Sequence, residues 1–537
     1  MNYKFDKYLI VIILTLGFFL RLKGIDFALP FLYDEDESRR VNQAWQILVS
    51  RDPNPRWFGH PASTLIYLQT INQLLIFWIG KLLGFFANFS DFQDLYFHNP
   101  TIFYLTGRAW LIAIDTGTIF VTYLVGKELK NHYVGLIAAL LIAVTPLQVK
   151  YAKIIRSDIL VTFFLVLSFL FCLKILAKNT RNNYLLSGVF LGLAIVTKYP
   201  ALMLTPSIII AHLISNQSQW WQERHKLFLT AYSCLLTSFL ASPFLFINMG
   251  ITLSNIRHEA RDGNLGANSE GFLSNLFWYW HHPLEYSVTI YGLVLIVIGL
   301  FFCGYFKDKK QIILVSFFVI FYVFISYLSL RWDRWIIPLL PFACLLISST
   351  LYQLYELFTK ISKQRLGLLV IVTLIMLIFT HLMFSTYKEI KEISGKDTRT
   401  ISREWILDNI PLGSSILVDE GTPPLDINSF KLYEVYNRTL TPIKEENSRH
   451  IFVGVEINPI GKLDNIEAIK EQKIEYFILS WKYLAYLNEA ERYPEIIAKY
   501  TKMINSAQLI YTLERNPQQN ITSGPTIKIY KLDTPIS

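Results

Sequence analysis

The sequence is poor in cysteine, and its cysteines form no recognisable pattern. Of 537 residues only four are cysteine, all within apolar segments and without the spacing of metal ligands: Cys172, Cys234, Cys303 and Cys344. The pattern implies neither a disulfide framework nor a cysteine-bound metal. We interpret all four as packing residues.

Nucleotide-binding loops are also missing. No glycine-rich pattern of the Walker or dinucleotide type occurs, so the sequence does not support a nucleotide-sugar donor. Charged residues are scarce at 17%, and the net charge of +9 comes mostly from Lys and Arg in short loops between apolar runs. Such placement indicates orientation in a membrane rather than binding to nucleic acid.

Long apolar runs dominate the chain. Hydrophobic residues make up 53% of it, and between residues 8 and 386 the runs are long enough to cross about 30 Å of hydrocarbon. From residue 387 the charges are dispersed and the apolar runs shorten to strand length. We therefore predict a multi-span α-helical membrane domain, residues 1–386, followed by a soluble α/β domain, residues 387–537.

Short basic loops predict the orientation. Those expected on the cytoplasmic side are 126–133, 174–183, 223–226, 306–310 and 359–365. The C-terminal domain and three loops then fall on the extracytoplasmic side: 29–100, 148–158 and 248–284. We predict about 11 spans plus juxtamembrane helices, among them an uncleaved first span and spans near 101–125, 134–150, 159–177, 227–247, 285–305, 311–329, 336–357 and 366–386.

Two segments depart from simple spans. "TKYP" divides residues 184–214 into two apolar pieces too short to cross the bilayer, which predicts a hairpin with its turn at membrane depth. Residues 60–86 are long enough to cross, but a span there would reverse the later basic loops. We interpret them as a helix in the interface, with Gln69, Asn72 and Gln73 near headgroup level, and leave the spanning alternative open.

Ionisable residues gather on the predicted outer side, where they are costly unless paired, solvated or used. A carboxylate there can act as general base toward an acceptor, and cations can hold a lipid phosphate and stabilise it as a leaving group. The set suits sugar transfer from a polyprenyl-phosphate carrier. It comprises Asp36, Glu37, Arg56, His60, Lys153, Arg156, Asp158, Lys198, His258, Glu259, Arg261, Asp262, His281, His282, Arg331 and Arg334.

These residues also have purely structural interpretations. Asp36 and Glu37 would suit the first turn of a helix, where carboxylates are favoured. Arg156 and Asp158 would suit a mutual ion pair at the start of a span. Arg331 and Arg334, which flank Trp332 and precede Trp335, would suit interfacial anchors.

A metal site is weakly indicated at most. His258 and Glu259 are the candidate ligands, but their spacing is unlike a zinc signature. No metal site and no cofactor is therefore firmly implied, and a divalent metal stays an open alternative.

Several segments share their order with a known family: "DESRRVNQA", "FGHPASTLIYL", "YAKIIRSDILVTFF", "GLAIVTKYPALMLTP" and "RWDRWIIPLLPFACLL". They resemble the membrane-embedded C-type glycosyltransferases, in the branch of protein O-mannosyltransferases and lipid A aminoarabinose transferases. Both Asp34-Glu35 and Asp36-Glu37 fit the family's acidic pair. The second fits better, because Ser38 and Arg39 match the small and the basic residue that typically come after the pair.

The resemblance implies an inverting glycosyltransferase that moves a sugar from a polyprenyl-phosphate donor to an extracytoplasmic acceptor. It implies catalytic roles for Asp36, Glu37 and Asp158. The donor phosphate would be bound by His60, Arg156, Lys198, Arg331 and Arg334. His60 stands where the family often has Lys or Arg, and Ala62 where a second proline is common.

The expected partners are the lipid-linked donor, membrane lipids and an acceptor that is a protein, a lipid or a glycan, with no nucleic acid. The expected location is the plasma or inner membrane, crossed several times, with the C-terminal domain outside. A transporter or flippase of lipid-linked sugars is the alternative. Inverted repeats would indicate it, but we find no second copy of the broken hairpin.

The C-terminal domain shows a simpler pattern. Its start, "DTRTISREWILDNIPLGSSILVDEG", predicts a helix, a turn and a strand. A helical stretch is expected around 483–506, and further strands are predicted at "RHIFVGV", "KIEYFILS", "SAQLIYTLE" and "GPTIKIYKL".

Overall fold

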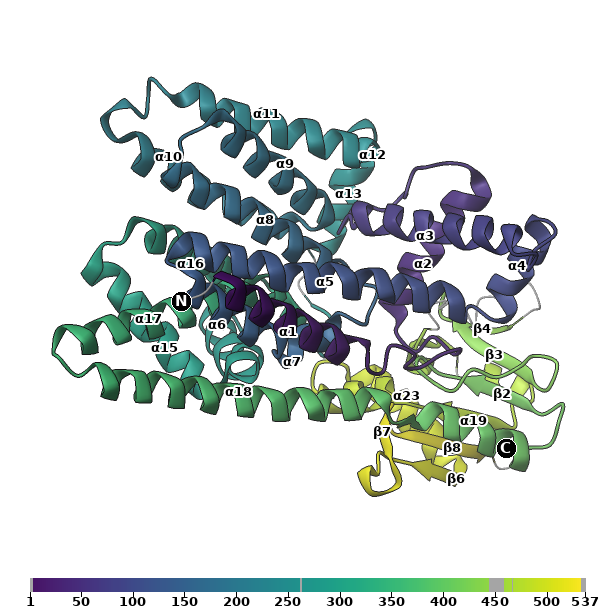
Figure 1. The fold of residues 1–537 in the computed structure, drawn as a ribbon. Coiled ribbons are helices and arrows are strands. Elements are labelled where there is room, and N and C mark those ends of the chain that lie inside the picture. Colours follow the sequence, from purple (N-terminus) through teal and green to yellow (C-terminus); the bar gives the residue numbers. More distant parts are fainter. Residues whose placement is uncertain (1–2, 261–262, 444–457, 466, 533–537) are drawn as a thin grey trace. The chain divides into compact units, whose positions relative to one another are not determined.

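The computed structural model describes residues 3–260, 263–443, 458–465 and 467–532, so Arg261 and Asp262 lie outside the described residues. The chain forms two units, each built from segments distant in sequence (Figure 1). The helical unit comprises Met1–Ile25, Gln43–Leu74 and Thr106–Ile390, and the sheet unit comprises Asp26–Asn42, Leu75–Leu105 and Lys391–Ser537.

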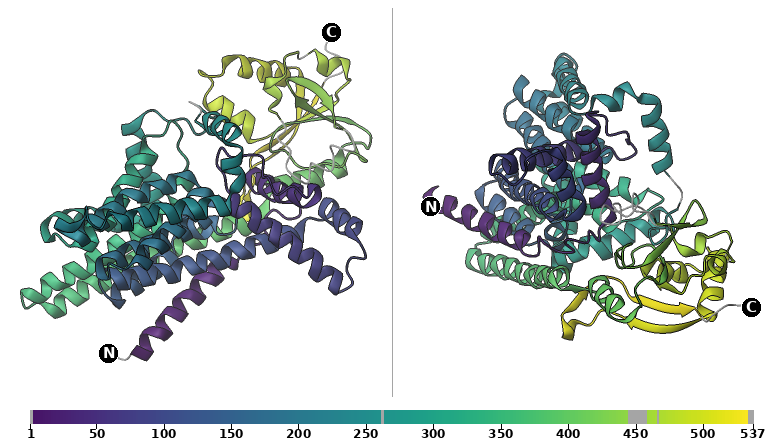
Figure 2. Two further views of the ribbon diagram at one scale, coloured as in Figure 1. Left: turned by 90° about the horizontal axis from the view of Figure 1, so that it is seen from above. Right: turned by 90° about the vertical axis from the view of Figure 1, so that its right-hand side faces the viewer.

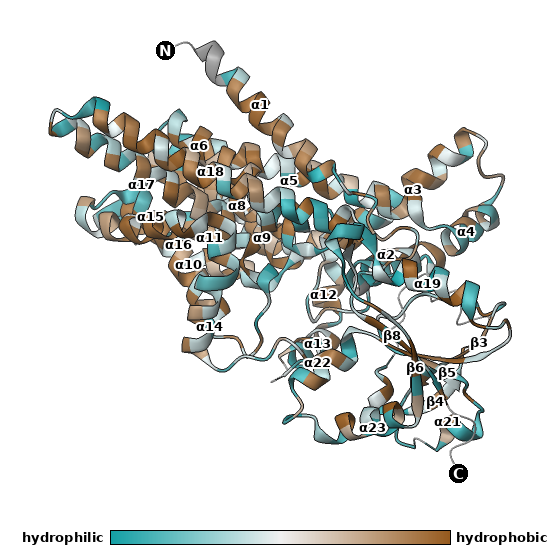
Figure 3. Cartoon of the chain, turned by 90° about the horizontal axis from the view of Figure 1, so that it is seen from below, coloured by the Kyte–Doolittle hydropathy of each residue, from teal (hydrophilic) through white to brown (hydrophobic). Residues whose placement is uncertain are grey.

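The helical unit confirms the predicted polytopic class. Seven helices of the described chain are long and apolar enough to cross a membrane, and hydrophobic residues dominate most of them (Figure 3). The total number of spans stays a prediction. The seven are α3 (Ser63–Leu82), α5 (Thr101–Leu129), α8 (Ser157–Ala177), α14 to α15 (Phe272–Phe306), α16 (Lys309–Ser326), η4 with α17 (Asp333–Lys360) and α18 (Gln364–Ser394).

Two of the predicted spans are not continuous helices, because each is interrupted at a proline. The span expected at 134–150 forms α6 (His132–Ala143) and α7 (Pro146–Tyr151). That expected at 227–247 forms α11 (Arg224–Ala241) and α12 (Pro243–Ile247). Proline lacks the N–H that a helix interior needs and disfavours helical backbone in the residue before it. The remaining helices of this region are α1 (Tyr3–Leu22), α2 (Glu35–Ser50) and α13 (Met249–Glu259).

The broken hairpin predicted around "TKYP" is present. Helix α9 (Arg181–Thr197) ends at Lys198, whose backbone is extended, and a short 3-10 helix, η1 (Tyr199–Leu204), leads into α10 (Thr205–Asn216). Helix α9 packs between α8 and α11, and Figures 1 and 2 show the long helices of this unit side by side. Gly188 and Gly192 permit the close approach to α11, because a side chain at either would overlap a backbone carbonyl there.

Helix α3 carries its polar residues on the inside of the protein, whereas their predicted level near the headgroups stays a prediction. Gln69, Asn72 and Gln73 are buried within the protein, whereas Ile71 and Trp78 are more than half exposed. A helix with apolar residues outside and polar residues inside suits a lipid surrounding, because only other protein groups can satisfy its amides.

The sheet unit contains a six-stranded mixed sheet in the order β4-β3-β2-β5-β8-β6. Strand β2 lies parallel to β3 and to β5, and the other pairs are antiparallel. Its core gathers apolar residues of α19 and of the strands. The strands are β2 (Ser415–Val418), β3 (Lys431–Tyr436), β4 (Thr439–Pro442), β5 (Tyr476–Leu479), β6 (Ala507–Leu513) and β8 (Ile527–Leu532).

Shorter elements complete this unit. Strands β1 (Lys396–Asp397) and β7 (Ile521–Ser523) form a separate pair. The helices are α4 (Phe89–His98), α19 (Thr398–Asn409), α21 (Ala468–Glu471), α22 (Trp481–Asn488) and α23 (Pro494–Asn505).

Most sequence predictions for the sheet unit are confirmed, namely α19, the strands β2, β5, β6 and β8, and helix around 483–506. The strand predicted at 449–455 lies outside the described residues. The β3–β4 hairpin was missed. Its two turn residues, Asn437 and Arg438, both have positive φ, as the favoured two-residue hairpin turns require.

Candidate functional site

The turn of the broken hairpin brings a lysine onto a buried carboxylate. Asp158 lies in the first turn of α8, and Lys198 occupies the break between α9 and η1. Their side chains, 3% and 14% exposed, form an ion pair of 2.5 Å between Nζ and Oδ1. Such a charge-assisted contact is strong at this burial, so the pair fixes the turn against the start of α8.

Two arginines join this pair, as the sequence predicted. Arg156 directly precedes α8, and Arg334 lies in the 3-10 helix η4 (Asp333–Leu339), which packs against α8. The charges of both arginines act on Asp158 and on Lys198. The structure thus brings together four predicted site residues from three separate segments.

A second carboxylate belongs to the same group. The Tyr151 hydroxyl donates a hydrogen bond of 2.9 Å to Asp333, and the charges of Arg156 and Arg334 also reach that hydroxyl. We call the five charged residues the charged cluster: Arg156, Asp158, Lys198, Asp333 and Arg334. Three cations and two carboxylates leave one formal positive charge.

His60 lies on a segment tied to both flanks of Lys198. The Thr64 and Thr197 hydroxyls are 2.6 Å apart, and the Tyr199 hydroxyl donates to the Phe58 carbonyl at 2.7 Å. The imidazole itself faces Glu259, with 3.4 Å between Nδ1 and Oε1. His60 therefore stands beside the hairpin turn as a carboxylate-oriented imidazole.

The weak metal candidates do not form a ligand set. Within the described residues no three His, Cys, Asp or Glu side chains come together as metal ligands. Glu259 is engaged with His60, and the His258 ring packs edge-on against Trp57, with centroids 6.0 Å apart. The geometry gives the divalent-metal alternative no support.

Arg331 has different surroundings from Arg334. Its guanidinium lies over the Trp278 ring at 5.4 Å and donates to the Ser274 hydroxyl at 3.3 Å. Glu270 lies at 4.0 Å. These contacts hold Arg331 against the segment that precedes and begins α14, whereas Arg334 acts on Asp158.

Asp36 and Glu37 belong to the sheet unit. The backbone N–H of Glu37 donates to the Asp34 carboxylate at 3.0 Å, so Asp34 caps α2. Glu37 is fully buried. The preceding segment is tied to α19, because the Tyr33 hydroxyl lies 2.9 Å from that of Thr400. The cap occupies Asp34, which favours Asp36-Glu37 as the acidic pair, and their catalytic roles stay predictions.

Sequence reasoning missed the partner of Arg21. This arginine is fully buried, and its Nε lies 2.5 Å from the Asp115 carboxylate of α5. It also donates to the carbonyls of Gly17, Ile142 and Ala143. Arg21 is therefore a structural residue in a buried ion pair, and nothing in the local sequence around Asp115 signals this role.

Lys153 is a second buried cation of the helical unit. It is fully buried, and among the described residues its ammonium group has no hydrogen-bond partner. Burial, with a smaller contribution from Arg21, lowers its pKa to about 7. A buried ammonium group without a partner loses its charge more readily than an exposed one.

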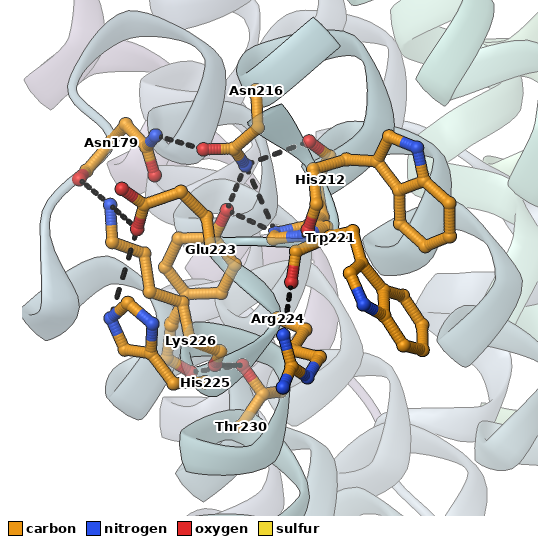
Figure 4. Close-up of polar contacts among 11 residues, drawn as sticks. Asn179, His212, Asn216, Trp221, Glu223, Arg224, His225, Lys226 and Thr230 are labelled. Carbon is orange, nitrogen blue, oxygen red and sulfur yellow. Dashed lines mark hydrogen bonds and ion pairs between the residues drawn. The ribbon is translucent and has the colours of Figure 1, made fainter. Parts of the chain in front are cut away.

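The opposite end of the hairpin is closed by a network of polar contacts, in which Glu223 also pairs with Lys226 (Figure 4). The Tyr184 hydroxyl lies 2.8 Å from His212 Nδ1, and His212 Nε2 lies 3.0 Å from the Trp220 carbonyl. The amide of Asn216 contacts both Tyr184 and His212. The network joins α9, α10 and the loop before α11, so it holds the hairpin together at the end away from Lys198.

Comparison with known proteins supports the predicted family. The profile described as Dolichyl-phosphate-mannose-protein mannosyltransferase matches residues 108–246, which include Arg156, Asp158 and Lys198. No curated protein sequence matches. The crystal structure of ArnT from Cupriavidus metallidurans bound to undecaprenyl phosphate is similar, with a TM-score of 0.56, 10% identity and 98% of each chain covered.

The fold is that of a C-type membrane glycosyltransferase. The same ArnT in its apo state also gives a TM-score of 0.56, with 10% identity and 97% of each chain covered. AglB, an archaeal oligosaccharyltransferase from Archaeoglobus fulgidus, gives a TM-score of 0.49 at 10% identity, over 90% of this chain and 71% of its own. Together with the apolar helices, the ArnT match establishes a multi-pass membrane protein of this fold, and the mannosyltransferase profile supports the predicted enzyme class rather than the transporter alternative.

Proposed function

We propose that the protein transfers a sugar, with inversion at the anomeric carbon, from a polyprenyl-phosphate donor to an acceptor outside the cytoplasm. The charged cluster is the observation that supports it most. Its three cations, Arg156, Lys198 and Arg334, are groups that can bind the phosphodiester linking a sugar to a lipid. The family profile covers Arg156, Asp158 and Lys198, and the ArnT structure contains a polyprenyl phosphate.

The cations are suited to stabilise the leaving group. When the bond between the anomeric carbon and the phosphate oxygen breaks, the lipid phosphate gains a second negative charge. Arg156, Lys198 and Arg334 then interact more strongly with it than with the intact donor, and this difference accelerates the reaction. Asp158 positions Lys198 through their 2.5 Å contact.

The acceptor needs a base. A carboxylate of Asp36 or Glu37 would take the proton of the acceptor hydroxyl as its oxygen attacks the anomeric carbon. His60, oriented by Glu259, would bind the donor phosphate in its protonated form. Arg331 would be a further cation for the phosphate, with a smaller contribution than Arg334.

The proposed setting follows the same orientation. Residues 387–537 would form a soluble domain outside the cell membrane, on the side where the acceptor is modified. The donor lipid would remain in the outer leaflet. The acceptor would be a protein, a lipid or a glycan.

Transfer in reconstituted vesicles tests the proposal. Radiolabelled polyprenyl-phosphate sugars are supplied with membrane extracts as acceptor source, and product is counted for the wild type and for Asp36→Asn/Glu37→Gln. We expect transfer by the wild type and its loss in the variant. The neighbouring variant Glu35→Gln tests the alternative pair Asp34-Glu35 and should transfer normally.

Each other outcome has a clear meaning. Transfer retained in a folded Asp36→Asn/Glu37→Gln variant would refute the assignment of the base. Labelled lipid that crosses the bilayer without transfer would replace the enzyme by a transporter. Absence of both, in a folded wild-type protein offered the full panel, would refute the proposed donor class.

A further inference from the structure

One edge of the six-stranded sheet ends in a pocket. Leu479 of β5 is paired with Lys528 of β8, and Ile527 of β8 with Leu513 of β6. The residues just beyond these pairs therefore meet at the same edge. They line a pocket of about 470 Å³: Trp481, Leu484, Ala485, Asn488, Glu514, Arg515, Gly524, Pro525 and Thr526. The pocket is a broad depression open to solvent.

The topology of the sheet also favours this edge. The chain passes from β2 to β3 on one side and later returns to β5 on the other side of β2. The carboxyl ends of β2 and β5 therefore form a switch point at this edge, and the pocket lies beside it, at the ends of β5, β8 and β6. Glu420 follows β2, and Trp481 follows β5 after Ser480, whose hydroxyl donates to the Glu420 carbonyl.

The aromatic wall of the pocket is held in place. The Trp481 side chain packs against Gly421, where any side chain would overlap the indole. Lys482 Nζ lies 4.4 Å from the centroid of this ring and 2.5 Å from the Glu420 carboxylate. Trp481 nevertheless remains 36% exposed. A fixed, accessible indole offers an apolar face without a further loss of side-chain freedom.

Polar groups stand beside this indole. The Arg515 Nε donates to the Gly524 carbonyl at 2.6 Å, which fixes the side chain. Among the described residues no carboxylate forms an ion pair with Arg515, so its terminal nitrogens remain available as donors. Glu514 and Asn488 supply acceptors and a further donor.

We propose that this pocket binds a saccharide, and that the acceptor is accordingly a glycan. The C–H face of a sugar ring would lie on Trp481, and its hydroxyls would bond to Arg515, Glu514 and Asn488. A neighbouring hollow of about 710 Å³, lined by residues 513–519, shares Glu514 and Arg515 and gives room for a second sugar. The pocket stands on its own, whereas its role for the acceptor rests on the proposed function.

Calorimetric titration of the full-length protein in nanodiscs tests the pocket. The probes are neutral disaccharides of mannose, galactose, glucose, arabinose and N-acetylglucosamine. We expect at least one to bind and its affinity to fall at least tenfold in Trp481→Ala and in Arg515→Gln. The matched control is Tyr436→Ala, which removes a side chain that is 53% exposed on β3 of the same unit and should leave binding unchanged.

Binding that persists in both pocket variants would overturn the proposal, as would failure of every disaccharide to bind the wild type. If peptides bind at Trp481 and the disaccharides do not, the pocket would be assigned to a protein acceptor instead. The role in transfer has a separate readout: Trp481→Ala should raise the KM for a glycan acceptor more than it lowers kcat. Saccharide binding without any donor turnover would retain the pocket and refute the transferase.

Discussion

Two of the buried carboxylates of the protein, one in each unit, are held in opposite ways. Asp158 in the helical unit is paired with Lys198 at 2.5 Å and lies within reach of two arginine charges. Asp419 in the sheet unit is fully buried and has mainly neutral partners. It accepts hydrogen bonds from the backbone N–H groups of Ile460 and Glu420, at 3.0 and 2.9 Å, and from the Tyr500 hydroxyl at 3.0 Å.

The partners of the two carboxylates distinguish a site that can bind a ligand from one that only stabilises the fold. Backbone and tyrosine donors are fixed by the fold and are fully used, so the Asp419 network has nothing left to offer a ligand. Asp158 lies among the cations Lys198, Arg156 and Arg334 of the described chain, which are groups that can bind an anion. A buried acid surrounded by cations therefore indicates a site for an anionic substrate, whereas one surrounded by neutral donors indicates packing.

The largest effect is expected from Lys198→Met. It removes a phosphate-binding cation and leaves Asp158 without its ion-pair partner. Transfer should fall by about 100- to 1,000-fold, and the unfolding free energy by about 3–5 kcal/mol. Vesicle transfer and thermal unfolding measure the two effects. The double variant Lys198→Met/Asp158→Leu separates them, because it should regain stability but not transfer; recovery of both would make the pair purely structural.

Arg334→Gln comes next, with Arg331→Gln as its matched control from the same motif. Loss of one charge-assisted hydrogen bond to the donor phosphate costs about 1.5–3 kcal/mol, or roughly 10- to 150-fold in kcat/KM for the donor. We expect a smaller effect from Arg331→Gln, because Trp278 and Ser274 already engage Arg331. Equal losses in donor kinetics would contradict the contrast that we draw between the two arginines.

Asp419→Asn tests the carboxylate that has mainly neutral partners, through the pH dependence of stability. Burial raises the pKa of Asp419 from 3.8 to about 6, so the folded state binds this proton more tightly than the unfolded state does. Its contribution to stability is complete below pH 3.8 and is lost as pH rises through about 6, a decrease of about 3 kcal/mol. Asp419→Asn should abolish this decrease and leave transfer unchanged.

Hydrogen exchange of the β2 and β5 amides, corrected for intrinsic rates, measures the stability of this region at each pH in the full-length protein. Protection that falls equally in the wild type and in Asp419→Asn over that interval would assign the pH dependence to another group.

Tyr500→Phe should give the smallest effect. It removes one donor to the Asp419 carboxylate, so the pKa of Asp419 should rise further, and stability at pH 7 should fall by about 0.5–1.5 kcal/mol. The midpoint of the pH dependence, followed by the same amide protection, should move upward. An unchanged midpoint would show that the two backbone donors alone hold Asp419.

The sequence was informative wherever function or backbone geometry leaves a local pattern. The break at Lys198 was predictable because Pro200 and the short apolar pieces mark it. Arg156, Asp158, Lys198 and Arg334 were singled out as ionisable residues in membrane-flanking segments, and the structure gathers them. That these residues lie together could be inferred only from the order of several motifs, because no single motif predicts a contact between α8 and η4.

Non-local contacts were beyond the sequence. Tyr33 and Thr400 are 367 residues apart, so no periodicity could assign the acidic segment to the sheet unit. The inward polar face of α3 was missed because its amides were taken for surface groups. The separate surroundings of Arg331 were missed as well, because two arginines three residues apart in one motif look equivalent until their neighbours are known.

The Arg21–Asp115 pair has a consequence for the assembly of the protein during synthesis. The two residues are separated by 94 positions, which at about 5–20 residues per second corresponds to roughly 5–20 s of translation. During that interval the first helix carries an arginine for which the hydrocarbon core has no counter-charge, and its end would stay near the headgroup phosphates. Asp115 of α5 later supplies the carboxylate that pairs with this arginine, so the packing of the first helix would be completed only after a later one has been inserted.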